Sequence, residues 1–358
     1  MSRVPLRRNR EFLLLQTGQL LSSIGTESTT IAYPLLVLAV THSPAKVGAV
    51  TFARIVPYPF FGVLTGVAAD RLNRKRLMIA ADGIRVLAVG SLVAAILLHR
   101  VGLWQIAIVA FVEGTASVLF YAAQSGALRP FQEEREPDRS TIRSQIAEGF
   151  RFLWAQPFLR TCALLFGLAN FIFPGVLIVI VVAGKRQGLS SGEIGGLTAA
   201  FGACLLIGSL LSPLLRRKLS VRRILLLELW TWTGSGLFLI WPNVYVLVAG
   251  ILPQALTIPT TDSVVVGYRT AMTPDRLLGR VNGAARNISL FVSPLGPLAA
   301  GLLLSAVAAR WTVAVFAGCG LALAVWGTLS PSIRKAPSLA ELDELPVHDA
   351  AAAAAPHG

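Results

Sequence analysis

The sequence predicts an all-α polytopic membrane protein with about ten transmembrane helices. Three observations support this prediction: a very apolar composition, apolar runs of bilayer-spanning length, and an uneven placement of Lys and Arg between those runs. Of the 358 residues, 54% are hydrophobic and only 14% are charged, and the mean hydropathy is +0.66. A soluble domain carries about 25% charged residues, so this composition indicates a chain that lies in lipid.

The predicted spans are helical, because lipid offers no hydrogen-bond partner for backbone N–H and C=O groups. A helix needs about 20 mostly apolar residues to cross the hydrocarbon core. Ten runs meet this length: residues 12–40, 47–69, 77–98, 103–125, 161–183, 193–215, 224–241, 244–267, 282–309 and 311–329.

These runs divide the chain into four parts. Residues 1–125 hold four spans and form a first half bundle, and residues 161–330 hold six spans and form a second. Residues 126–160 are a polar linker. Residues 331–358 form a polar and alanine-rich tail that we expect to be disordered.

Basic residues set the expected orientation in the membrane. The loops on the side of the N-terminus hold 24 of the 32 Lys and Arg residues, and the opposite loops hold five. Cytoplasmic loops carry an excess of these residues. We therefore expect a multi-pass protein of the inner or plasma membrane with both termini in the cytoplasm, and a basic start that leads into a retained first span.

Several classes of function are disfavoured by the sequence. The net charge of +14 is confined to short loops between apolar runs, so we expect no nucleic-acid partner. The three cysteines lie singly in apolar runs and indicate neither a disulfide framework nor a metal site. Paired histidines at metal-ligand spacing, a nucleophile elbow and a Gly-rich phosphate loop are all missing, so neither an enzyme nor a cofactor is predicted.

The linker holds one helical pattern. Ile142, Ile146, Phe150 and Leu153 follow one another at spacings of 4, 4 and 3, which places them on one helical face. We expect an amphipathic helix that lies on the cytoplasmic leaflet. A solvated connector is the alternative.

The tight loop between the second and third spans reads "GVAADRLNRKRL". Orientation alone explains its basic residues, but it does not explain Asp70, because acidic residues contribute little to topology. Gly66 is equally unexplained and would let the end of the second span approach another helix. Asp82 and Arg85 lie three residues apart on one helix face close to this loop. These residues could form one ion-pair cluster with Arg71 and Arg74.

This loop resembles the signature loop of the major facilitator superfamily. The stretches "MIAADGIRVL", "GQLLSSIGTESTTIAYPLLVL", "SQIAEGFRFLWAQPFLR" and "TPDRLLGRVNGAARN" resemble its drug and siderophore (enterobactin-type) exporter branch. The resemblance runs from about residue 12 to residue 330. Two residues depart from the pattern: Asn73, where the superfamily often has Gly, and Glu27, where the branch tends to carry Asp.

The resemblance implies two six-helix halves that rock about a central site. It also implies that the loop charges hold one conformation closed on the cytoplasmic side. The candidate gating residues are therefore Gly66, Asp70, Arg71, Arg74, Asp82 and Arg85. Topology signals with local pairing are the alternative for this cluster.

The superfamily pattern has twelve helices, whereas this sequence shows ten. The ends of the fourth and eighth spans, "LFYAAQSGALR" and "LTIPTTDSVVVGYR", look like equivalent positions of a repeat. The eighth span is followed by two more spans, but the fourth is followed directly by the linker. The fifth and sixth helices of the fold are thus missing, through a natural deletion, an error in the gene model, or a variant that assembles as a dimer.

Ionisable residues inside spans are costly and mark candidate sites. Glu27, Arg54 and Glu113 lie in the first, second and fourth spans, and all three can face the first-half cavity of the fold. Burial disfavours the charged form of a carboxyl group, so Glu27 or Glu113 could bind and release a proton. A structural Glu–Arg pair that locks helices together is the alternative.

The second half holds three further candidates. Glu228 and Arg286 lie near cytoplasmic ends of spans, where snorkelling to the surface would explain them. Asp262 lies about a turn and a half from the end of its span, and we expect it to pair with a loop arginine rather than to bind substrate.

The resemblance therefore predicts a secondary active transporter that exports amphipathic small molecules, such as drugs, macrolides or siderophores, in exchange for protons. Its partners would be the bilayer and a small-molecule substrate, and its oligomeric state stays open. No nucleotide-binding domain is present, so energy would come from an ion gradient. Uptake of a metabolite and a non-transporting remnant or scaffold are the alternatives.

Overall fold

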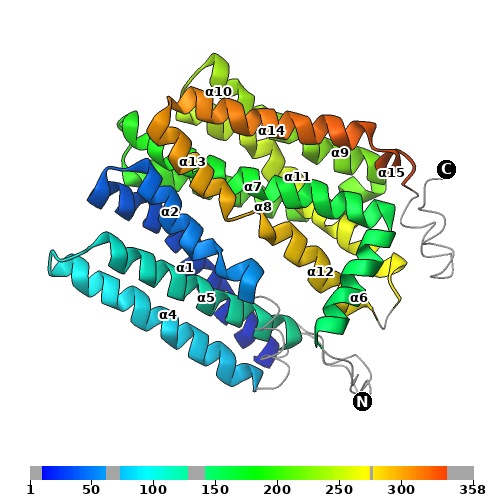
Figure 1. The fold of residues 1–358 in the computed structure, drawn as a ribbon, viewed down its shortest axis with the longest axis horizontal. Coiled ribbons are helices and arrows are strands. Elements are labelled where there is room, and N and C mark those ends of the chain that lie inside the picture. The colour runs from blue at the N-terminus through cyan, green and yellow to red at the C-terminus, as the bar shows by residue number, and fades with distance from the viewer. Residues whose placement is uncertain (1–9, 62–72, 128–141, 275–276, 337–358) are drawn as a thin grey trace.

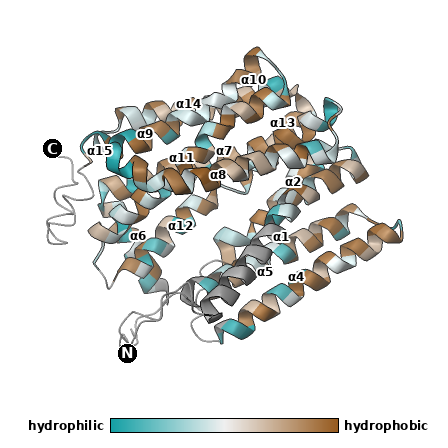
Figure 2. Ribbon diagram, turned by 180° about the vertical axis from the view of Figure 1, so that it is seen from behind, coloured by the Kyte–Doolittle hydropathy of each residue, from teal (hydrophilic) through white to brown (hydrophobic). Residues whose placement is uncertain are grey.

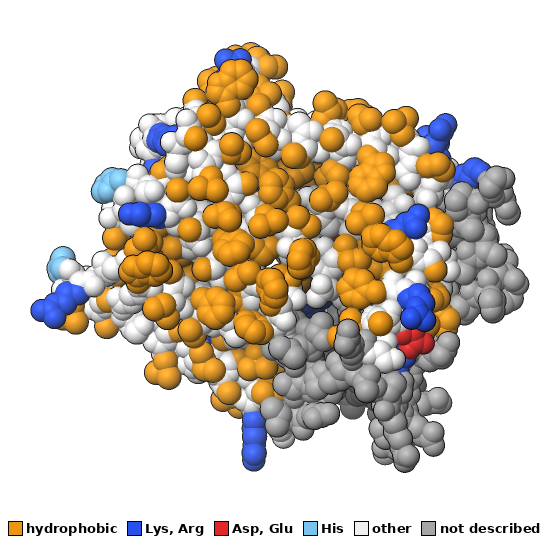
Figure 3. Space-filling view, viewed as in Figure 1, with side chains coloured by type: hydrophobic (Ala, Val, Ile, Leu, Met, Phe, Trp, Pro, Cys, Tyr) orange, Lys and Arg blue, Asp and Glu red, His pale blue; other side chains and the backbone are white. Residues whose placement is uncertain are grey.

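The computed structural model describes residues 10–61, 73–127, 142–274 and 277–336. Helices make up nearly all of these residues, and they run roughly side by side in two groups (Figure 1). On the face shown in Figure 3, the described side chains are mostly apolar, and the Lys and Arg side chains lie mainly toward its edges. The all-α, multiply spanning fold predicted from the sequence is confirmed.

The first group contains the helices of the first half. They are α1 (Arg10–Thr41), α2 (Pro44–Ile55), α4 (Arg74–Leu97) and α5 (Leu103–Ala127). A break at Val56, followed by Pro57, separates α2 from a helical stretch at residues 57–61, because proline cannot donate the next helical hydrogen bond. Asn73 caps α4 by accepting a hydrogen bond from the backbone N–H of Arg76 at 3.2 Å.

The second group contains ten helical segments. They are α7 (Pro157–Arg186), α8 (Ser191–Lys218), α9 (Val221–Thr231), the 3₁₀ segment η2 (Trp232–Gly236), α10 (Leu237–Ile240), α11 (Val244–Met272), α12 (Leu278–Phe291), α13 (Leu295–Ala306), α14 (Ala309–Leu329) and α15 (Pro331–Arg334). Helix α7 lies at the centre, and its residues 178–184 are all buried. Many apolar side chains of α4 and α8, by contrast, are exposed, as helices that face lipid require. Both helices are coloured largely as hydrophobic in Figure 2.

Within the described residues, eight helical segments are long and apolar enough to cross a membrane. They coincide with the last eight of the ten predicted spans. The first predicted span lies within α1, and the second runs beyond residue 61 into residues that are not described. Only residues 128–141 separate α5 from α6, which is too few for another span. The interpretation that a helix pair is missing stays a prediction.

Two of the spans are interrupted. The span that begins with α9 changes to 3₁₀ geometry at Trp232 before it continues as α10. The span at residues 278–306 bends between α12 and α13, where Pro294 precedes Gly296 and Pro297. The prolines interrupt the helical hydrogen bonds, and Gly296 lets α13 approach α7 closely, because a side chain there would collide with the backbone of Phe171.

The linker contains α6 (Ile142–Ala155), where the sequence predicts an amphipathic helix. This helix packs against α12 of the second half rather than lying apart from the protein. Glu148 forms an ion pair with Arg280, and Gly149 lies directly against the backbone of Arg280. Leu153 is buried. The apolar face of α6 is therefore partly covered by protein.

Candidate substrate cavity and buried charge network

The two halves touch each other where α2 begins. The backbone N–H of Ala45 donates a hydrogen bond of 3.0 Å to the hydroxyl of Ser305 in α13. Gly48 and Gly301 bring the two helix backbones into contact, since a Cβ on Gly301 would lie 2.8 Å from the Cα of Gly48. Small residues permit this close approach between membrane helices. The halves are thus closed against each other at this end.

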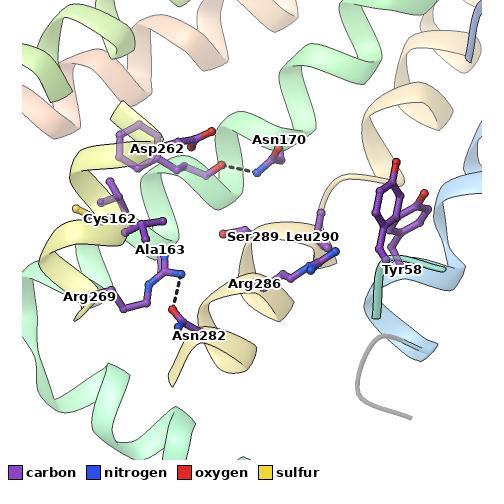
Figure 4. Close-up of a pocket in the computed structure, with 14 residues that line it drawn as sticks. Tyr58, Cys162, Ala163, Asn170, Asp262, Arg269, Asn282, Arg286, Ser289 and Leu290 are labelled. Carbon is purple, nitrogen blue, oxygen red and sulfur yellow. Dashed lines mark hydrogen bonds between the residues drawn. The ribbon is translucent and has the colours of Figure 1, made fainter. Parts of the chain in front are cut away.

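A cavity of about 670 Å³ lies between the halves, away from this contact. The first half contributes Tyr58 and Tyr121, and the second half contributes residues of α7, α11 and α12 (Figure 4). The polar lining from the second half is Asn170, Asp262, Arg269, Asn282, Arg286 and Ser289. Its apolar lining includes Phe166, Val265 and Leu290. A largely apolar cavity with a few convergent polar groups is the usual form of a small-molecule site.

Two polar side chains of the cavity are linked by a hydrogen bond. Arg269 donates a hydrogen bond of 3.2 Å to the side-chain oxygen of Asn282. Asp262 lies two helical turns before Arg269 in α11, and no ion pair joins the two side chains among the described residues. Asn170 donates to the backbone carbonyl of Phe166 at 3.0 Å. Arg286 extends from α12 toward the side of the cavity where Tyr58 lies (Figure 4).

A network of buried charges lies in the first half, one helical turn from the cavity. The Nε of Arg54 donates to a carboxylate oxygen of Glu113 at 2.6 Å. Glu113 is 0% exposed and Arg54 is 9% exposed. The guanidinium of Arg54 also donates to the hydroxyls of Thr30 and Thr29 at 2.9 and 3.0 Å. Tyr58, which lines the cavity, follows Arg54 by four residues.

The network continues to the middle of α4 (Arg74–Leu97). The other carboxylate oxygen of Glu113 lies 3.5 Å from the guanidinium of Arg85, and Arg85 lies 3.3 Å from Asp82. Two sets of residues that the sequence treats separately, Arg54–Glu113 and Asp82–Arg85, are therefore one chain of ion pairs. Gly114 makes this possible, because it lets α5 pack directly on the backbone of Arg54 in α2.

Other predicted members of these clusters lie elsewhere. Glu27 is exposed, and within the described residues it forms no ion pair with Arg54. The expected three-residue network therefore contains Arg54 and Glu113 but not Glu27. Gly66, Asp70 and Arg71 lie outside the described residues. Arg74 begins α4, but its side chain is not described.

The second-half candidates also differ from expectation. Glu228 is only 5% exposed, so snorkelling to the surface is wrong for this residue. Arg286 lines the cavity, so its position is not explained by snorkelling alone. Asp262 lines the cavity as well and forms no ion pair with a loop arginine in the described part of the chain. Burial and cavity shape depend on neighbouring helices, which local sequence does not reveal.

The sequence analysis missed several residues of interest. Gln254 is 0% exposed and lies on the same face of α11 as Thr257 and Thr261, at spacings of 3 and 4. Gly250 lies on this face too and touches Gly234 of η2, so the polar stripe is directed at η2 and α9. The signal was present in the sequence, because three polar residues at helical spacing inside an apolar span are unusual.

Some known proteins are similar to this chain in sequence, and some are similar in fold. Residues 161–352 match the family model described as Major Facilitator Superfamily, and residues 2–129 match a model described as Transmembrane secretion effector. The uncharacterized MFS-type transporter YfiS of Bacillus subtilis (strain 168) is 29% identical over 146 residues. That alignment covers 40% of this chain and 34% of the relative, so it spans about a third of the relative's length.

The crystal structure of the nucleoside transporter NupG has a similar fold. It superposes with a TM-score of 0.64 at 11% identity and covers 84% of this chain and 94% of that chain. At this identity the likeness concerns the fold alone, and the resemblance to the exporter branch stays a prediction. Since the superfamily model matches more than half of the sequence, the chain belongs to the major facilitator superfamily of membrane transporters.

Proposed function

We propose that this chain is a proton-coupled exporter of amphipathic small molecules that works by alternating access. The observation that carries the proposal is the cavity lined by both halves, with Tyr58 and Tyr121 on one side and α7, α11 and α12 on the other. A solute bound there contacts both halves. Relative motion of the halves would therefore change the access of the solute to the two sides of the membrane.

The contacts between the halves suggest which parts move. In the conformation described, the backbones of α2 and α13 are in contact at Gly48 and Gly301, and the cavity lies toward the other end. Beside the cavity the halves also touch, since Asn287 donates a hydrogen bond of 3.1 Å to the carbonyl of Pro59. The charge distribution of the loops favours a cytoplasmic location for that other end. Export would then require the cavity to close around Tyr58 and the contact between Gly48 and Gly301 to open.

The buried network is the candidate link between the cavity and the loop after the second span. Glu113 joins Arg54, one turn from the cavity, to Arg85 and Asp82, which lie in the helix that follows this loop. A shift of α2 relative to α5 would change these ion pairs. Glu27 and Glu113 are the two carboxylates proposed to exchange protons, and no cofactor is needed if the proton gradient supplies the energy.

The test is a toxicity panel in a bacterial strain that lacks its own pumps. The strain would express the wild-type chain or its Glu27→Gln, Glu113→Gln or Asp70→Asn variant at equal membrane abundance. The proposal expects raised tolerance to some compounds, and loss of that tolerance in at least one carboxylate variant. Tolerance that persists in all three variants would contradict proton coupling through these residues. Unchanged tolerance in the wild type would contradict export.

Uptake is the second candidate function. The similarity of fold to a nucleoside transporter is compatible with it and suggests a probe. Accumulation of radiolabelled uridine by cells that express the chain, abolished by a protonophore, would favour uptake. If neither export nor uptake is detected for a well-inserted protein, the first half with four helices would favour a remnant that does not transport.

A further inference from the structure

We propose that the central cavity selects solutes with an apolar or aromatic body and one acidic group, and that Arg286 is the residue that binds the acidic group. This inference rests on the proposed function, since it names the substrate class of the same site. It is carried by the charge balance of the cavity and by the side chains that face Arg286.

The described residues of the cavity lining have an excess of positive charge. Its charged residues are Asp262, Arg269 and Arg286. Arg269 is already engaged, because it donates a hydrogen bond to Asn282, and it lies two helical turns after Asp262 in α11. Among the described residues of the lining, one positive charge therefore remains without a negative counterpart, and it belongs to Arg286.

Arg286 is positioned to meet a solute. It is exposed within the cavity and extends away from α12 toward Tyr58 (Figure 4). Among the described residues it forms no ion pair and no hydrogen bond. A lone cation within a membrane span is costly unless it is hydrated or meets an anion. The planar guanidinium presents a fork of N–H donors that matches a carboxylate or phosphate group.

The rest of the lining suits the body of such a solute. Tyr58 and Tyr121 provide aromatic surface from the first half, and Phe166, Val265 and Leu290 provide apolar surface from the second. Asn282 and Ser289 are neutral hydrogen-bonding groups on α12, the helix that carries Arg286. A cationic solute would meet the uncompensated arginine and would be disfavoured by like-charge repulsion.

The experiment compares two dyes with the same ring system and opposite charge. Fluorescein is an anion at neutral pH and rhodamine 123 is a cation, so their affinities separate charge from shape. Binding would be measured by fluorescence anisotropy with the full chain in phosphatidylcholine nanodiscs. The variants are Arg286→Gln, Arg286→Lys and, as a matched control, Arg217→Gln, which removes an exposed arginine at the end of α8 outside the cavity lining.

The proposal expects the wild type to bind fluorescein more tightly than rhodamine 123. Arg286→Gln should weaken fluorescein binding about tenfold or more, the effect of one charge-assisted hydrogen bond. Arg286→Lys should retain part of the affinity, and Arg217→Gln should retain all of it. Absence of fluorescein binding, a preference for rhodamine 123, or an Arg286→Gln variant that binds fluorescein as the wild type does would overturn the inference.

A second measurement separates this inference from the proposed function and from lipid binding. Proton-driven movement of either dye in inside-out vesicles reports transport, whereas anisotropy reports binding alone. Transport of rhodamine 123 without binding of fluorescein would retain the exporter and refute the anion site. Displacement of fluorescein by added phosphatidylglycerol would show that Arg286 binds a lipid headgroup, and would refute a soluble substrate at this position.

Discussion

The ion pairs of Glu113 predict the order in which substitutions in the buried network lower the free energy of unfolding. Glu113 faces two arginines, with Arg54 at 2.6 Å on one carboxylate oxygen and Arg85 at 3.5 Å on the other. Glu113→Gln removes both attractions at once and leaves two cations close together. Arg54→Met removes only the first, because Arg85 still faces the carboxylate. Asp82→Asn affects only the outer member of the network, which is about half exposed.

The structure sets the expected size of each effect. Removing one partner of a buried ion pair costs about 3 to 5 kcal/mol in free energy of unfolding. We expect Glu113→Gln near the upper end of this range, since its side chain is 1% exposed and both arginines depend on it. Arg54→Met should fall near the lower end. Asp82→Asn should cost less than about 1 kcal/mol, as solvent-exposed pairs do.

Reversible unfolding in mixed micelles, with increasing mole fraction of dodecyl sulfate, would measure these free energies through tryptophan fluorescence. The double variant Arg54→Met with Glu113→Gln completes a thermodynamic cycle and should cost clearly less than the sum of the single variants. Equal costs for Glu113→Gln and Arg54→Met would refute the central position of Glu113. Additive costs would refute the direct contact between the two side chains.

Three other predictions concern the contact between the halves and the second half. Gly48→Ala should destabilise the protein by about 1 to 3 kcal/mol, because the new methyl group meets the backbone of α13. The control Gly90→Ala, on exposed α4, should leave the stability unchanged or raise it. Equal shifts of the melting temperature in the two variants would contradict the contact between Gly48 and α13. Cysteines at Ala45 and Ser305, in a background without the native cysteines, should form a disulfide under oxidation that stops transport, and reduction should restore it. Unchanged transport with a complete cross-link would show that this end need not open. Glu228→Gln should keep or raise the melting temperature, since the buried carboxylate forms no ion pair among the described residues, and a large fall would reveal a cationic partner.

Much of this architecture follows from the sequence, because each membrane span is determined by the residues of one continuous segment. Length and polarity alone decide whether a segment can cross a bilayer, so eight predicted spans coincide with helices in the structure. Helical spacing likewise places Asp82 next to Arg85, and the amphipathic pattern of Ile146 and Leu153 identifies α6. The buried pair of Arg54 and Glu113 could also be expected, since isolated charges in lipid-facing spans need a partner.

The contacts between helices, by contrast, were determined only by the tertiary structure. The crossing of α2 and α5 at Gly114 joins the two charge pairs into one network and leaves Glu27 outside it. The packing of α9 on α11 buries Glu228, although its position near a span end suggested exposure. Helices pack through side chains that are far apart in the chain, so such contacts leave no periodic signal. For the same reason, the sequence did not reveal that Tyr58 and Arg286 share one cavity.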